Sequence, residues 1–138
     1  MSKQYWLMKS EPDVYGWDDL VKEGSGIWDG VRNHSAKLNM MAMKVGDEVI
    51  FYHSNIGREA VGIMKVTEEY FPDPTADEGS PWVVVRLEPV RKLNRAVTLA
   101  EFKAEPRLQD MDLIKYMRLS VGKIKPQEWD VVMEMAQS

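Results

Sequence analysis

The sequence of 138 residues contains no cysteine, and its two histidines are His34 and His53. A chain without cysteine has no disulfide framework, no thiolate zinc site and no cysteine nucleophile, and it is typical of a reducing compartment. Two histidines complete a transition-metal site only if carboxylates converge on them in the fold. We therefore predict no metal, no cofactor and a cytoplasmic location.

The sequence also lacks long apolar runs and several common enzyme motifs. No run approaches the length that spans a bilayer, and Lys9, Glu11 and Asp13 come too early for a signal peptide. The patterns G-x-x-x-x-G-K-S/T, G-x-G-x-x-G and G-x-S-x-G do not occur. These absences predict a soluble protein without a membrane partner, and they disfavour phosphate-cradling enzymes and serine hydrolases.

Charge is unevenly distributed along the chain. Lysine and arginine number 18 against 22 acidic residues, which gives a formal net charge of -4. This balance argues against a protein that binds nucleic acid mainly by neutralising phosphates. Acidic residues gather between Glu68 and Glu78, whereas basic residues follow between Arg86 and Lys125. A local basic face and an ordinary solvated surface both fit this pattern.

Length and hydrophobic patterning predict one domain over residues 1–138. Strands are expected at residues 5–8, 48–53, 60–66, 82–87 and 119–124, and short helices at 18–22, 36–43, 98–103 and within 107–116. Pro126 is suited to the first turn of a closing helix, whose apolar face would contain Trp129, Val132, Met133 and Ala136. We expect an α+β fold, a small curved β-barrel of about five to six strands flanked by short helices, because closure protects strand edges.

Polar residues stand next to aromatic residues at the ends of the predicted strands. If the barrel brings these ends together, Trp28 offers a flat stacking surface, and Ser10, Asn33 and Ser54 can satisfy the polar edge of a planar heterocycle. Each feature also has an ordinary structural explanation. A tryptophan is usually part of the core, and Ser or Asn at a strand end usually serves turn chemistry.

Several segments, in their order and spacing, resemble the EVE domain, which is the family of thymocyte nuclear protein. This family belongs to the PUA-like superfamily. Gly26-Ile27-Trp28 also looks like the tryptophan segment of the related YTH domains, which bind N6-methyladenine in RNA. The resemblance covers essentially the whole chain. Its segments are Tyr5-Trp6-Leu7-Met8-Lys9-Ser10-Glu11-Pro12, Trp28-Asp29-Gly30-Val31-Arg32-Asn33, Gly46-Asp47, Phe51-Tyr52-His53-Ser54, Val61-Gly62-Ile63 and Arg118-Leu119-Ser120-Val121.

The resemblance implies a base pocket with Trp28 as its aromatic wall. It also implies that Asn33 hydrogen-bonds the base and that Arg118 contacts the base or an adjacent phosphate. The family usually continues its last motif with glutamine and proline, whereas residues 122–124 are Gly-Lys-Ile here. The polar lining implied by the resemblance comes from four segments and consists of Lys9, Ser10, Asn33, His53, Ser54, Arg118 and Ser120.

The resemblance implies a non-catalytic reader that takes a flipped, modified base, first a modified cytosine such as 5-methylcytosine in DNA and second modified RNA. An alternative is an amidohydrolase similar to the PUA-like ASCH proteins, which use a lysine and a glutamate on acetylated cytidine. Strand alternation places Lys9 and Glu11 on the same side, as such a pair requires. A third alternative is a module that binds other proteins through exposed methionines and aromatics. We expect a monomer.

Overall fold

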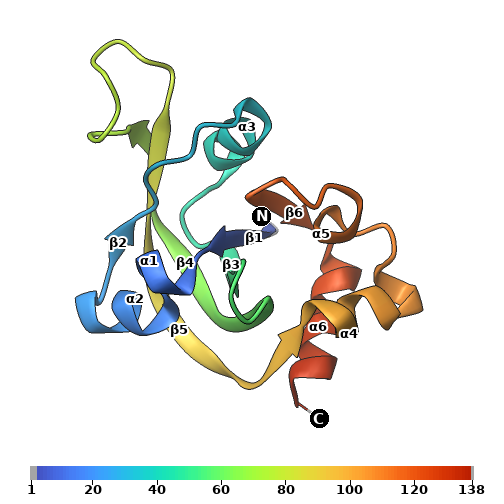
Figure 1. Cartoon of the computed structure of the whole chain (residues 1–138). Coiled ribbons are helices and arrows are strands. Elements are labelled where there is room, and N and C mark those ends of the chain that lie inside the picture. The colour runs from blue at the N-terminus through green and yellow to red at the C-terminus, as the bar shows by residue number, and fades with distance from the viewer. Residues whose placement is uncertain (1–2, 138) are drawn as a thin grey trace.

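The computed structural model describes residues 3–137, which form one mixed sheet with short helices on both faces (Figure 1). The sheet is six-stranded, in the order β2-β5-β4-β3-β1-β6. The strands are β1 (Tyr5–Ser10), β2 (Gly26–Ile27), β3 (Glu48–His53), β4 (Glu59–Pro72), β5 (Val83–Thr98) and β6 (Val121–Ile124). The helices are α1 (Pro12–Tyr15), α2 (Trp17–Glu23), α3 (His34–Ala42), α4 (Leu99–Ala104), α5 (Asp112–Lys115) and α6 (Pro126–Gln137), with a 3₁₀ turn, η1, at Pro106–Leu108.

Side-chain alternation along the strands divides the core into two clusters, one on each face of the sheet. In β1, Trp6 and Met8 belong to the first cluster and Leu7 to the second. Helices α2 and α3 supply side chains to the first cluster, and α4, α5 and α6 supply them to the second. Because both faces are covered, the strands read as nearly continuous apolar runs, as the sequence of β1 and β3 shows.

The sheet is not closed into the barrel that the sequence analysis predicts. Among residues 3–137, β2 pairs with β5 alone and β6 pairs with β1 alone, so both are edge strands. The long pair β4–β5 contains several register shifts, which bend and twist a sheet locally. The edges need no closure because β2 has 2 residues and β6 has 4, and short edge strands offer little backbone for unwanted pairing.

Most of the predicted elements are present with shifted ends. The hairpin of residues 48–53 and 60–66 is confirmed as β3 and β4, which pair antiparallel. The closing helix begins at Pro126 and buries Trp129, Val132 and Ala136 of its predicted apolar face, whereas Met133 is only partly buried against the same cluster. Strand β5 continues to Thr98, far beyond the predicted end at residue 87, and α1 and β2 were not predicted. No helix within residues 3–137 combines the length and apolar character needed to cross a membrane.

Candidate functional site: a cavity beside Trp28

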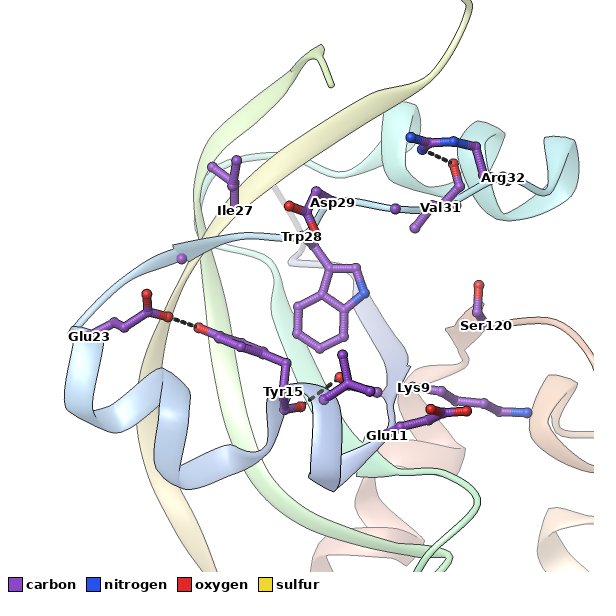
Figure 2. A pocket seen from close by; sticks show the side chains of 14 residues that line it. Lys9, Glu11, Tyr15, Glu23, Ile27, Trp28, Asp29, Val31, Arg32 and Ser120 are labelled. Carbon is purple, nitrogen blue, oxygen red and sulfur yellow. Dashed lines mark hydrogen bonds between the residues drawn. The ribbon is translucent and has the colours of Figure 1, made fainter. Parts of the chain in front are cut away.

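A cavity of about 550 Å³ opens where the end of β1, helix α1, strand β2 and the loop after β2 meet (Figure 2). This volume lies within the usual range of small-molecule pockets. We call it the Trp28 cavity. It is lined by Lys9, Ser10, Glu11, Val14, Tyr15, Glu23, Gly26, Ile27, Trp28, Asp29, Gly30, Val31, Arg32 and Ser120.

The sheet and the core hold Trp28 in place. Its backbone N–H donates to the Val85 carbonyl at 2.9 Å, which extends the ladder between β2 and β5 by one residue. Its indole meets Phe51 edge-on with centroids 5.2 Å apart and Tyr15 edge-on at 6.3 Å. Trp28 is 8% exposed, so it is a wall built largely into the core. Its position is therefore set by its contacts with the strand and the core.

The indole nitrogen of Trp28 is an available donor. Within residues 3–137 it forms no hydrogen bond, and no side-chain nitrogen or oxygen sealed from solvent there lacks a partner. The N–H must therefore open onto solvent, and Figure 2 shows it on the side of the ring that faces Ser120. The Ser120 hydroxyl is likewise without a partner in that range. Two free donors thus face the same part of the cavity.

Helix α1 forms the opposite wall and is held by two hydrogen bonds. The Ser10 hydroxyl donates to the Tyr15 carbonyl at 2.6 Å, and the Tyr15 hydroxyl donates to Glu23 at 2.5 Å. Burial and the bond to Glu23 raise the pKa of Tyr15, so the phenol stays protonated. A Cβ on Gly26 would lie 2.7 Å from the Tyr15 hydroxyl, so glycine allows β2 to pass close to this hydroxyl. Helix α1 buries no residue of its own, and Val14 is 74% exposed.

The buried carboxylate of Asp73 fixes the loop that carries Trp28. It accepts hydrogen bonds from the Gly30 backbone and the Arg32 guanidinium, both at 3.0 Å, and from Thr75 at 2.6 and 2.7 Å. Burial by itself raises the pKa of Asp73, but the hydrogen bonds from Thr75, Gly30 and Arg32 outweigh it and lower the value to about 2. The acidic loop after β4 is therefore joined to the cavity rim.

Lys9 lines the cavity with its stem and turns its charge away. Its ammonium donates to the Met117 carbonyl at 2.7 Å, and Figure 2 shows the side chain running away from Trp28. Burial lowers the pKa of this half-buried lysine. No ion pair joins Lys9 to Glu11 within the described range, so the lysine–glutamate pair of the hydrolase alternative is not preassembled. In that range no group of three acidic or histidine side chains could hold a metal ion.

Four of the residues implied by the resemblance line the Trp28 cavity together: Lys9, Ser10, Trp28 and Ser120. The others lie elsewhere. The Asn33 side chain caps α3 by accepting from the Ala36 N–H at 3.0 Å, and Asn33 lines a separate cavity with Arg118.

His53 and Ser54 lie in two further cavities and do not line the Trp28 cavity. His53 Nε2 accepts from the Trp17 backbone N–H at 3.1 Å, which fixes the start of α2. Burial lowers the pKa of His53, which keeps this acceptor neutral. The sites implied for Asn33, His53, Ser54 and Arg118 therefore do not coincide with the cavity that contains Trp28.

Tyr15, Glu23 and Asp73 also belong to the site, and no sequence motif considered above includes them as site residues. Pro12 could have indicated α1, because proline is favoured at the first turn of a helix as well as at a break. The order Asp73-Pro74-Thr75 could have indicated the anchor, because an aspartate commonly accepts from the backbone two residues further on. Nothing local indicates that Tyr15 reaches Glu23.

The fold and the cavity together define a small α+β domain whose sheet carries an open, aromatic-walled pocket. A sequence profile of the EVE domain matches residues 4–135, and the chain belongs to this family. Human thymocyte nuclear protein 1 is 32% identical over 95% of this chain and 73% of its own length. A Rhodopseudomonas palustris protein solved by NMR is 50% identical, with a TM-score of 0.91 over 97% of this chain and 93% of its own.

One similar structure is that of the human THYN1 protein in complex with 5-methylcytosine-containing DNA. It is 32% identical, with a TM-score of 0.89 and 99% coverage of both chains. The YTH domain of Zygosaccharomyces rouxii MRB1, solved with N6-methyladenosine RNA, has a TM-score of 0.59 at 14% identity over 98% of this chain and 87% of its own. The second likeness shows a shared fold alone.

Proposed function

We propose that the Trp28 cavity binds a modified cytosine that has been flipped out of DNA, and that the protein is a reader without catalytic activity. The observation that carries this proposal is one open cavity whose lining includes an indole wall, two free donors and two unpaired carboxylates. The human relative that was solved with 5-methylcytosine-containing DNA supports the same ligand class.

The cavity lining contains the types of group that the hydrogen-bonding edge of cytosine needs. Cytosine donates from its N4 amino group, and a carboxylate is a common acceptor for that donor. Glu11 and Asp29 line the cavity and have no partner within residues 3–137. The ring nitrogen and carbonyl of cytosine accept, and the indole N–H of Trp28 and the hydroxyl of Ser120 can donate to them. An apolar substituent such as a methyl group would lie against Val14 or Ile27.

The small exposed fraction of Trp28 sets a condition on binding. Flipping a base costs a few kcal/mol, and stacking on an aromatic ring returns about 1–3 kcal/mol. With 8% of Trp28 exposed, a base cannot stack on the indole unless another part of the cavity lining moves away from it. Helix α1 is the part best suited to move, because it buries no residue and is held mainly through Ser10 and Glu23.

The test is a binding titration of wild type and Ser120→Ala with matched DNA and RNA oligonucleotides. These carry unmodified, methylated or hydroxymethylated cytosine, or N6-methyladenine. We expect tighter binding to modified cytosine in DNA, and a loss of about five- to tenfold in Ser120→Ala because one hydrogen bond to the base is removed. Ser80→Ala, a serine outside the cavity, is the matched control. Trp28→Phe tests the wall with less risk to the core than alanine.

Equal binding to modified and unmodified oligonucleotides would refute the reader proposal. The half-buried Lys9, whose pKa burial lowers, would then favour the hydrolase alternative with Glu11. Release of acetate from N4-acetylcytidine by wild type, and its loss in Lys9→Met and Glu11→Gln, would establish that activity. Absence of turnover would leave the protein-interaction alternative.

A further inference from the structure

A second cavity of about 290 Å³ shares Lys9 with the Trp28 cavity. We call it the Tyr52 cavity. It lies between the turn that joins β3 to β4, the start of α4 and the segment after α5. Its lining consists of Lys9, Tyr52, Ser54, Asn55, Arg58, Leu99, Leu113 and Met117.

The two cavities differ in the charge of their linings. Glu11, Glu23 and Asp29 line the Trp28 cavity, whereas no carboxylate lines the Tyr52 cavity within the described residues. The polar groups there include an ammonium, a guanidinium, two hydroxyls and an amide. A lining with two cationic side chains and no carboxylate favours an anionic ligand. The Trp28 cavity, by contrast, suits a neutral ring.

Arg58 is an arginine without a carboxylate partner in the part of the chain that the structure describes. Four other arginines, Arg32, Arg86, Arg95 and Arg107, each pair with an acidic side chain. Arg58 has a backbone φ of 49°, and Asn55 in the same turn has a φ of 68°. Left-handed conformations are uncommon for residues other than glycine and gather at functional turns. This turn holds an unpaired guanidinium at the cavity.

Tyr52 provides a buried donor that points at the same space. It is 3% exposed, and its hydroxyl forms no hydrogen bond within residues 3–137. Because no sealed side-chain oxygen in that range lacks a partner, solvent must reach this hydroxyl, and Tyr52 lines the cavity. Burial raises the pKa of Tyr52 to about 12, so the group is a donor at neutral pH. The Lys9 ammonium lies 6.0 Å from the Tyr52 ring centroid and donates one hydrogen bond to Met117, which leaves two donors free.

We propose that the Tyr52 cavity is an anion site that takes a phosphate group through Arg58, Lys9 and the Tyr52 hydroxyl. Such a group has two sources. One is the phosphodiester next to the base in the Trp28 cavity, and this version rests on the proposed function. The other is a free phosphate monoester, which does not depend on it. In either case Lys9 connects the two sites, because its stem lines one and its charge serves the other.

The first experiment titrates inorganic phosphate into the protein at constant ionic strength, with chloride as the balancing anion, and follows backbone amide NMR shifts of residues 52–58. The variants are Arg58→Gln and Tyr52→Phe, which keeps the ring in the core. Arg91→Gln is the matched control, because Arg91 also lacks a carboxylate partner and lines neither cavity. We expect the Kd for phosphate to rise about tenfold in both variants and to be unchanged in the control.

The second experiment uses a 5-methylcytosine oligonucleotide and the phosphate-free nucleoside 5-methyldeoxycytidine with the same proteins. If the strand supplies the phosphate, Arg58→Gln lowers oligonucleotide affinity about tenfold and leaves nucleoside affinity unchanged. The slope of log K against log salt also becomes shallower by about 0.7–0.9. If the variants weaken the binding of inorganic phosphate but not that of the oligonucleotide, the natural source of the phosphate group is a free monoester.

The anion site is refuted if neither variant differs from Arg91→Gln in the phosphate titration or the oligonucleotide titration. A wild-type protein that binds modified and unmodified oligonucleotides equally is a different outcome. It refutes the proposed reader function, and the phosphate titration still decides the anion site.

Discussion

At the scale of single residues, Asp73 joins the loop after β4 to the loop that carries Trp28. Its carboxylate has no exposed side-chain surface and receives donors from the Trp28 loop and from its own turn. Trp82, at the far end of the same loop, lies near the Arg32 guanidinium at 5.8 Å and near the His34 ring at 4.8 Å. Two long loops are thus joined beside the cavity.

Asp73→Ala is expected to destabilise the protein by about 1–3 kcal/mol at pH 7, because several donors lose their acceptor. The pKa of Asp73 falls from 3.8 to about 2 on folding, so this contribution is present above the higher value and is lost as pH falls through the lower one. The free energies of unfolding of wild type and variant should therefore converge as the pH falls. Urea unfolding of both proteins between pH 7 and pH 2 measures this convergence.

Asp77→Ala is the control for this change, because Asp77 is an exposed aspartate of the same loop. It should leave the free energy of unfolding within about 0.5 kcal/mol of wild type. If Asp73→Ala changed the free energy of unfolding as little as Asp77→Ala does, the loop would not be anchored through this carboxylate. A loss of modified-base affinity in Asp73→Ala alone would show that the anchor also shapes the cavity.

At the scale of elements, the contact between α2 and β4 positions the wall of the cavity. A Cβ on Gly62 would lie 2.5–2.6 Å from ring atoms of Trp17, so the indole lies directly on the strand backbone. Trp17 also meets Phe51 edge-on at 5.7 Å, and Phe51 in turn meets Trp28. One chain of ring contacts therefore connects α2 to the cavity.

Gly62→Ala is expected to cost about 1–3 kcal/mol of stability, since neither the strand nor the packed ring can move freely. A double-mutant cycle with Trp17→Phe measures the coupling, because the smaller ring leaves room for the added methyl group. The cost of Gly62→Ala should be lower in the Trp17→Phe background. Equal costs in both backgrounds would show that the methyl group does not clash with the indole.

At the scale of the whole molecule, the net charge of -4 limits how the protein can bind DNA. Arg58 and Arg118 both line cavities and have no carboxylate partner within residues 3–137. If these two contact phosphates, the slope of log K against log salt should be about -1.4 for single strands and about -1.8 for duplex DNA. A titration between low and moderate salt gives the slope. A slope of about -4 or steeper would indicate binding by general phosphate neutralisation instead.

The sequence by itself determined the features that depend on neighbours along the chain. Alternation and turn residues predict the β3–β4 hairpin, and the capping pair of Thr98 and Glu101 begins α4 as expected. The apolar spacing from Trp129 to Ala136 predicts the buried face of α6. The EVE domain resemblance was also visible, because its motifs are short runs of consecutive residues.

The tertiary structure alone decided where the polar side chains go. Asn33 and His53 have their acceptors occupied by Ala36 and Trp17, and Lys9 turns to Met117, whose position in sequence is distant. Strand pairing likewise leaves the sheet open and extends β5 through register shifts with β4. These outcomes depend on which atoms meet across the fold, and a side chain's hydrogen bonds go to the partners that folding brings near, not to those that its sequence neighbours suggest.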